Sequence, residues 1–289
     1  MNVLVIGGAG FIGSNLIGSL LHEGHSVLSL DNYLTGSEAN HHGGAVYIYG
    51  CAGDVATLQF DADLVFHLGE FSRVEQSDVE PWICLANTIR TLPSVLQYCH
   101  ERKAKLIYSG SSTKFSEAKN PYILAKRLNT ELVHELCQQY AIPYAITYFY
   151  NVYGPGEIAS GKYATVVAKF IDAKKQGKEI TITGDGHQRR HFTHVDDIVN
   201  GLIIVANGGD GDGYGIGADE AVSILELAET IGVRYRFVDD KPSNRKDSML
   251  MTEKTRFLGW KPKNDLFEYI ASCLDEKQES KSLAVAVNG

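Results

Sequence analysis

The chain has 289 residues, of which 44% are hydrophobic, and this is long enough for one large α/β domain with a smaller second lobe. Its formal net charge of −8 argues against the basic face that a nucleic-acid-binding protein presents. Five cysteines are scattered without a Cys-x-x-Cys pair, so the sequence predicts neither a disulfide framework nor a metal site. No apolar run approaches the roughly 18 residues that span a membrane. We therefore expect a cytoplasmic protein with no membrane partner.

Strand and helix patterns alternate along the first half of the chain. A short apolar run at 2–6 precedes a glycine cluster and predicts a buried parallel strand. Strands are also expected at 26–30, 46–49, 64–68, 105–108 and 144–149. Helices are expected at 11–23, at 82–100 with Pro93 as a kink or break, and at 122–140. This alternation predicts an α/β fold with a doubly wound parallel sheet of the Rossmann type.

The pattern loosens after Asn151, where glycines gather and the expected strands become short. Helices are expected at 163–175, 195–206 and 222–231. We therefore expect a first domain at 1–150, a smaller α/β lobe at 151–275 that is partly interleaved with it, and a mobile tail at 276–289.

A glycine-rich segment joins the first expected strand to the first expected helix. Gly7 allows a tight turn, Gly10 lets the backbone approach a pyrophosphate, and Gly13 permits close packing of helix on strand. The free N–H groups at the start of that helix favour the same anion. Asp31 ends the second strand at about the spacing expected of a ribose-binding carboxylate. A carboxylate repels the 2′-phosphate of NADP, and Asn32 brings no positive charge to hold it, so the sequence predicts NAD as cofactor.

A tyrosine and a lysine lie four residues apart on the helix expected at 122–140. Tyr122 and Lys126 therefore share one helix face. The spacing alone is weak evidence, but the preceding strand ends in a hydroxyl cluster that includes Ser111, and α/β sheets bind ligands at that edge. An ammonium and a nicotinamide nearby would lower the pKa of a tyrosine, which is ordinarily near 10, and would make it a usable base. We therefore expect acid–base chemistry at Tyr122.

Taken together, the motifs resemble those of the extended short-chain dehydrogenases/reductases, specifically the NAD-dependent sugar-nucleotide epimerases and dehydratases of the UDP-glucose 4-epimerase kind. The resemblance covers about 1–275. It rests on Gly-Gly-Ala-Gly-Phe-Ile-Gly at 7–13, Gly-Asp at 53–54, Val-Phe-His-Leu at 65–68, Tyr-x-x-x-Lys at 122–126, Asn-Val-Tyr-Gly-Pro-Gly at 151–156, Gly-Asp-Gly-x-Gln-x-Arg at 184–190 and Leu-Gly-Trp-x-Pro at 258–262.

The resemblance implies a role for each matching position. Tyr122 would be the acid and base, Lys126 would hold the nicotinamide ribose, and Ser111 would hold the sugar hydroxyl. Asn151 and Arg190 would bind the diphosphate of the substrate. The implied cofactor residues are Gly7, Gly10, Phe11, Ile12, Gly13, Asp31, Asn32, Asp54 beside the adenine, Val55, Leu68, Asn87 near the nicotinamide, Tyr122 and Lys126.

Two further positions concern the substrate pocket. In related 4-epimerases a position that aligns with Ser248 lines the sugar pocket, and a small residue there admits an N-acetyl group. Relatives often carry alanine where this chain has Glu70, and the sequence assigns that glutamate no role. The resemblance also implies a homodimer that pairs the helices expected at 82–100 and 122–140.

Several reactions share this scaffold. Related dehydratases place an Asp-Glu pair directly after the hydroxyl residue, whereas this chain has Ser112 and Thr113, so dehydration is disfavoured. Reduction with NADPH conflicts with Asp31, and decarboxylation of a uronate is less well excluded. We expect NAD-dependent epimerisation at C4 of a nucleotide-diphosphate sugar through a transient 4-keto sugar. The alternatives are another NAD-dependent sugar-nucleotide enzyme (a decarboxylase, dehydratase or reductase) and a non-catalytic NAD-binding protein.

Overall fold

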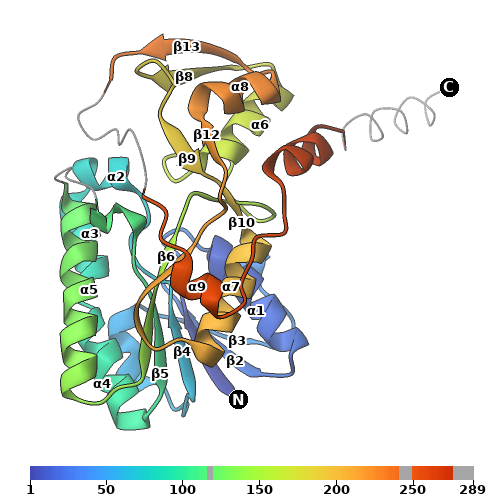
Figure 1. Ribbon diagram of the computed structural model, residues 1–289. Coiled ribbons are helices and arrows are strands. Elements are labelled where there is room, and N and C mark those ends of the chain that lie inside the picture. Colours follow the sequence, from blue (N-terminus) through green and yellow to red (C-terminus); the bar gives the residue numbers. More distant parts are fainter. Residues whose placement is uncertain (116–119, 241–248, 276–289) are drawn as a thin grey trace.

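The central feature of the computed structural model, which describes residues 1–115, 120–240 and 249–275, is one large parallel sheet (Figure 1). Its strands are β1 (Asn2–Ile6), β2 (Ser26–Asp31), β3 (Val46–Tyr49), β4 (Leu64–His67), β5 (Lys105–Ser109), β6 (Tyr144–Phe149) and β11 (Gly211–Ile216). Within the described residues, the seven strands follow the order β11-β6-β5-β4-β1-β2-β3, and every neighbouring pair is parallel. The doubly wound sheet predicted from the sequence is confirmed.

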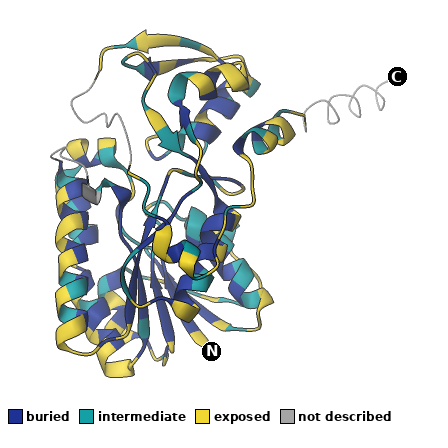
Figure 2. Ribbon diagram, viewed as in Figure 1, coloured by how far each residue is buried: buried dark blue, intermediate teal, exposed yellow. Residues whose placement is uncertain are grey.

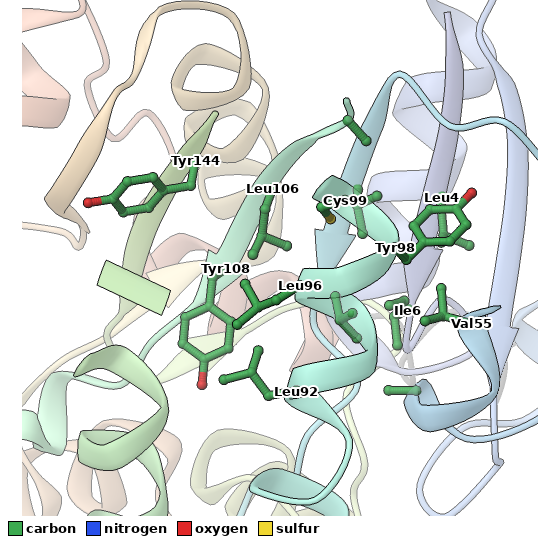
Figure 3. Close-up of a cluster of buried hydrophobic side chains, with 14 of the residues drawn as sticks. Leu4, Ile6, Val55, Leu92, Leu96, Tyr98, Cys99, Leu106, Tyr108 and Tyr144 are labelled. Carbon is green, nitrogen blue, oxygen red and sulfur yellow. The ribbon is translucent and has the colours of Figure 1, made fainter. Parts of the chain in front are cut away.

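Helices cover both faces of this sheet. Alternate residues of β1 belong to two different cores, because successive side chains of a strand point to opposite faces. Val3 and Val5 pack with α1 (Phe11–His22) and α7 (Val195–Gly208). Leu4 and Ile6 lie in the other core, which α4 (Leu92–Arg102) and α5 (Pro121–Gln139) cover (Figure 3). The inner strands β1, β4, β5 and β6 are almost wholly buried, whereas the edge strand β3 is partly exposed and α5 exposes its outer side (Figure 2).

The region expected as one helix at 82–100 is divided into separate helices. The structure has α2 (Val74–Val79), α3 (Pro81–Thr88) and then α4. Pro81 and Pro93 each lie in the first turn of a helix, where the missing N–H costs no hydrogen bond. The predicted break at Pro93 is therefore real, and it separates α3 from α4.

A smaller lobe covers the carboxyl ends of the main strands. It contains β8 (Glu179–Thr183) paired with β13 (Arg234–Val238), β9 (Arg189–His191) paired with β12 (Ala221–Ser223), and β7 (Val152–Tyr153) paired with β10 (Thr193–His194). Its helices α6 (Val166–Gln176) and α8 (Ile224–Ile231) share a core with the helical residues 266–275.

The two lobes exchange segments along the chain. After the first elements of the small lobe, the chain returns to the main domain as α7, which packs on α1, and then as β11, which pairs with β6 in the main sheet. Short segments complete the fold, namely α9 (Glu253–Phe257) and the turns η1 (Glu38–Asn40), η2 (Ala52–Thr57) and η3 (Ser112–Phe115). Of the helices in the described part of the chain, none has the length and hydropathy to cross a membrane.

Candidate active site

A cleft of about 990 Å³ lies along the carboxyl edge of the parallel sheet. It runs from the glycine loop after β1, past the ends of β2, β4, β5 and β6, to β8 and β9 of the small lobe. This is the edge at which open α/β sheets bind ligands. Its lining includes Gly7, Gly10, Phe11, Ile12, Gly13, Asp31, Asn32, Leu68, Glu70, Arg73, Asn87, Ser111, Tyr122, Lys126, Asn151 and Arg190.

The glycine loop has the shape that a pyrophosphate needs. A Cβ atom on Gly7, which has φ +87°, would lie 2.6 Å from the backbone of Gly69. A Cβ atom on Gly13 would lie 2.1 Å from the carbonyl oxygen of Gly7. Gly7, Gly10 and Gly13 all border the cleft, and among the described residues no side chain caps the start of α1. The loop therefore presents the helix N-terminus to an anion.

Asp31 lies beside the glycine loop at the end of β2. Its Oδ2 accepts the N–H of Ala9 at 2.9 Å, and its Oδ1 accepts the N–H of Tyr33 at 2.8 Å. Next to it, the side-chain amide of Asn32 donates to Oδ1 of Asn87 on α3 at 3.1 Å. These contacts fix a carboxylate where a cofactor ribose would bind, with two amides close by.

The hydroxyl groups of Tyr122 and Ser111 meet at the centre of the cleft. Tyr122 is 9% exposed, and its OH donates to Oγ of Ser111 at 3.2 Å. The same Oγ lies 2.8 Å from Oγ1 of Thr113. A sugar hydroxyl that replaced either contact would meet one group able to take its proton and another able to bind its oxygen.

The first turn of α5 places Tyr122. The side chain of Asn120 caps the helix by accepting the N–H of Ile123 at 2.8 Å, and Pro121 occupies the first turn. The N–H of Tyr122 donates to Oγ of Ser77 on α2 at 3.3 Å. The start of the helix, and with it the tyrosine, is thus fixed against α2.

Lys126 is held one helical turn further on, with its side chain 5% exposed. Its Nζ donates to Oε2 of Glu70 at 2.6 Å and to the carbonyl oxygen of Ser109 at 2.8 Å. His67 lies behind this ion pair, with Nε2 3.5 Å from Oε1 of Glu70. Burial lowers the pKa of His67 to about 4, so its ring is neutral at neutral pH.

The far end of the cleft carries the residues expected to bind a diphosphate. Arg190 lies on β9, and its Nη1 donates to the carbonyl oxygen of Arg189 at 2.8 Å. Asn151 follows β6 with φ +32°, and its amide donates to the carbonyl oxygen of His191 at 3.3 Å. The hydrogen bond from Asn151 to β9 places these two residues at the same end of the cleft.

Arg73 joins the main domain to the loop before α6. Its Nε and Nη2 both donate to the carbonyl oxygen of Tyr163, at 3.0 and 2.6 Å. Burial lowers the pKa of this guanidinium, while Tyr122 and Glu157 act in the opposite direction. An arginine keeps its charge even so, and a cation therefore lies close to the proposed acid and base.

Two of the predicted site residues, Asp54 and Val55, do not line the cleft. The carboxylate of Asp54 accepts the N–H of Cys51 at 2.8 Å in the turn η2, and Val55 is fully buried beside it. Gly50 and Ala52 line the cleft there instead. Ser248 lies outside the described residues, so its place in a sugar pocket stays a prediction.

Sequence reasoning missed the roles of Glu70, Arg73 and Thr113. Glu70 and Arg73 follow β4 at the same sheet edge as the glycine loop, and a charged residue directly after a buried strand is a usable signal. Thr113 was noted only as the wrong residue for a dehydratase. Its contact with Ser111 depends on the turn η3, which the sequence does not predict.

Comparison with known proteins agrees with this geometry. The model of the NAD dependent epimerase/dehydratase family matches residues 3–217. A putative UDP-glucose 4-epimerase of Methanocaldococcus jannaschii is 29% identical over 296 residues, covering 93% of this chain and 95% of the relative. A UDP-N-acetyl-alpha-D-glucosaminuronate decarboxylase of Bacillus cytotoxicus is 29% identical over 256 residues, covering 79% and 78%. The crystal structure of a Thermotoga maritima UDP-glucose 4-epimerase with UDP-glucose has a TM-score of 0.88 at 26% identity, covering 97% and 99%.

The chain belongs to the NAD-dependent epimerase/dehydratase family. Its fold and its glycine loop are those of an extended short-chain dehydrogenase/reductase, as the sequence analysis predicted. NAD is the cofactor of this family, and the residues around the loop fit it. The relatives include epimerases, decarboxylases and dehydratases that act on sugar nucleotides, so membership alone leaves the reaction open.

Proposed function

We propose that the protein inverts C4 of a nucleotide-diphosphate sugar through a transient 4-keto sugar. The observation that carries the proposal is the contact between the hydroxyl groups of Tyr122 and Ser111 in the cleft. Tyr122 takes the proton of the sugar 4-hydroxyl while Ser111 binds the oxygen. Bound NAD supplies the hydride acceptor and then the hydride donor. Once the 4-keto sugar has turned and C4 has regained a hydride on its opposite face, Tyr122 returns the proton to the 4-oxygen.

The residues after Ser111 support epimerisation over dehydration. Dehydration needs further acid and base groups at C5 and C6 of the sugar, but Ser112 and Thr113 carry only hydroxyl groups. Oγ1 of Thr113 lies 2.8 Å from Oγ of Ser111, so its hydroxyl supports the same sugar-hydroxyl site and adds no acid or base. The relative from Methanocaldococcus jannaschii and the Thermotoga maritima structure both bear the name UDP-glucose 4-epimerase.

The nucleotide end of the substrate would be held by the small lobe. In this proposal residues 1–150 bind NAD, and residues 151–275 supply Arg190 for the diphosphate. An arginine can bind two phosphate oxygens at once. Such remote binding keeps the substrate anchored while its reacting ring turns.

A panel of UDP-, dTDP-, GDP- and CDP-sugars tests the proposal, with products identified by NMR. We expect one hexose nucleotide to be converted into its C4 epimer without loss of water or carbon dioxide. Formation of a 4-keto-6-deoxy sugar would establish a dehydratase, and formation of a pentose from a uronate would establish a decarboxylase. Net consumption of NADH would establish a reductase. Bound NAD with no turnover of any sugar would favour the non-catalytic alternative.

We further propose that the protein is a homodimer of the cytoplasm. Large apolar side chains are exposed together on neighbouring helices, namely Trp82 and Ile83 on α3 and Leu124 and Leu128 on α5. Exposed apolar clusters of this kind mark protein–protein interfaces. All five cysteines are free thiols, in keeping with a reducing compartment.

A further inference from the structure

Glu70 is a buried carboxylate at the centre of the site. It follows β4 at the carboxyl edge of the sheet, and its side chain is 1% exposed. A carboxylate so deeply buried is costly unless charged or polar partners surround it. Its partners therefore indicate why a glutamate is tolerated at this position.

Three side chains donate hydrogen bonds to this carboxylate. Nζ of Lys126 lies 2.6 Å from Oε2, and Nδ2 of Asn129 lies 2.8 Å from Oε1. The hydroxyl of Tyr108 donates to both oxygens, at 2.9 and 3.1 Å. Lys126 and Asn129 come from α5, and Tyr108 comes from β5. Glu70 thus joins the helix that carries the catalytic pair to the sheet beneath it.

The contacts leave Lys126 able to bind the cofactor. An ammonium has three N–H donors. Among the described residues, Glu70 accepts one and the carbonyl oxygen of Ser109 accepts another, which leaves a third donor for the nicotinamide ribose. Burial lowers the pKa of Lys126, but Glu70, with smaller contributions from Tyr122 and Cys84, raises it above its ordinary value. The lysine therefore enters the reaction as one half of an ion pair.

Apart from Arg73, the other titratable groups that face the ion pair are neutral near neutral pH. Burial raises the pKa of Tyr108 well above its ordinary value, and burial raises that of Cys84 on α3 to about 11. His67 on β4 stays unprotonated because burial lowers its pKa to about 4. Arg73 contributes a positive charge on the side of Tyr122. The charge of Lys126 is therefore balanced by Glu70.

We propose that Glu70 is a positioning residue that acts through Lys126, balancing its charge and thereby setting the pH range over which Tyr122 and Lys126 take up and return the proton of the sugar. The proposal rests on the proposed role of Tyr122. The negative charge of Glu70, 2.6 Å from Nζ of Lys126, makes the lysine of this pair hold its proton more tightly. The wild-type pair consequently releases its first proton at a higher pH than it would beside a neutral residue.

Glu70→Gln tests this inference because the amide keeps the size of the side chain and removes the charge. Whichever of Tyr122 and Lys126 releases its proton first, the pair does so at lower pH in the variant, since coupled groups titrate together. We expect the acid limb of the kcat–pH profile to move down by about one pH unit or more. Glu70→Asp, which keeps the charge, should retain the wild-type limb. A limb that stays in place in Glu70→Gln overturns the proposal, because a purely structural role changes the amplitude and not the limb.

A measurement without substrate separates this inference from the proposed function. In the NAD-bound protein, NMR of ¹³C-labelled tyrosine and ¹⁵N-labelled lysine follows the two groups directly. The first titration of Tyr122 or Lys126 should occur at lower pH in Glu70→Gln than in wild type. Tyr108→Phe, which removes one hydrogen bond to the carboxylate and keeps its charge, should leave that titration in place. If the protein turns over no sugar nucleotide, the reaction is wrong, yet this titration still decides the role of Glu70.

The wild-type protein supplies a second check that does not depend on the folding of the variant. The ¹³C signal of the Glu70 carboxyl group should be that of an ionised carboxylate throughout the pH range of activity. A protonated Glu70 in that range would carry no charge to balance Lys126, and the inference would then be wrong.

Discussion

The hydroxyl of Tyr122 lies 3.2 Å from that of Ser111, although the two residues belong to different elements. Ser111 follows β5, whereas Tyr122 lies in the first turn of α5. The cap at Asn120 and the bond from the Tyr122 N–H to Ser77 hold the helix start at this distance. The proposed acid–base group is therefore placed by backbone contacts that do not involve its own hydroxyl.

Because of this arrangement, Tyr122→Phe should remove the proton carrier and leave the fold intact. We expect kcat to fall by at least about 100-fold, the usual contribution of general acid–base catalysis. The melting temperature should change little, since Phe fills the same space. Tyr140→Phe at the other end of α5 is the matched control and should retain activity. Near-normal turnover by Tyr122→Phe would contradict the proposed acid–base role of Tyr122.

Asp31→Ala should weaken the binding of NAD and reduce the preference over NADP. The substitution removes both the charge that repels a 2′-phosphate and the acceptor for the N–H of Ala9 in the glycine loop. Hydrogen bonds to a charged group are worth about 1.5–3 kcal/mol, which corresponds to a loss of affinity of roughly 10- to 100-fold. Calorimetric titration of both cofactors measures this, with Asp61→Ala on the far surface as control. Equal affinity of the wild type for NAD and NADP would show that Asp31 does not select the cofactor.

The fold was largely predictable because periodic burial determines it. Successive residues of β1 are all apolar because they pack alternately into two cores, one on each face of the sheet. A strand of this kind is recognisable in the sequence as a continuous apolar run. The glycine loop was equally accessible, since steric limits at Gly7 and Gly13 leave no other residue type. Local sequence rules are sufficient to predict a feature, such as β1 or the glycine loop, that depends only on one element and the element next to it in the chain.

The centre of the site was harder to predict because it depends on contacts between distant segments. Glu70 meets Lys126 and Asn129 across 56 and 59 residues of sequence. Arg73 meets Tyr163 across 90 residues. No spacing rule links such pairs, and the loop and lobe that bring them together must be built first. The sequence therefore predicted the residues of the family motifs and missed the polar partners that hold them.

Trp82→Glu should dissociate the proposed dimer. Trp82 is 79% exposed on α3, the helix that packs beside α5, and a charge there would have to be buried in an interface between two copies. Sedimentation velocity should show a shift from dimer to monomer. Phe257→Glu is the matched control, because Phe257 is 91% exposed on α9 and lies outside that surface. A monomeric wild type, or a dimer unaffected by the charge at Trp82, would contradict the interface.

His67 should make the protein less stable in mild acid. The ring is fully buried, and in the described structure neither ring nitrogen has a hydrogen-bond partner. Its pKa is lowered from 6.5 to about 4 in the folded chain. Between these two values the unfolded chain binds the proton and the folded chain does not, so stability falls as the pH drops from about 6.5 to about 4 and then levels off. The total loss is on the order of 3 kcal/mol, at about 1.4 kcal/mol for each unit of pKa shift.

Urea unfolding of the wild type and of His67→Gln at a series of pH values isolates this effect. Carboxylates titrate in both proteins, so the difference between the two stability curves reports on the histidine alone. We expect His67→Gln to be less sensitive to acid between about pH 6.5 and pH 4, whatever its stability at neutral pH. Parallel curves for the wild type and His67→Gln across this range would mean that the ring takes up its proton in the folded protein as readily as in the unfolded chain.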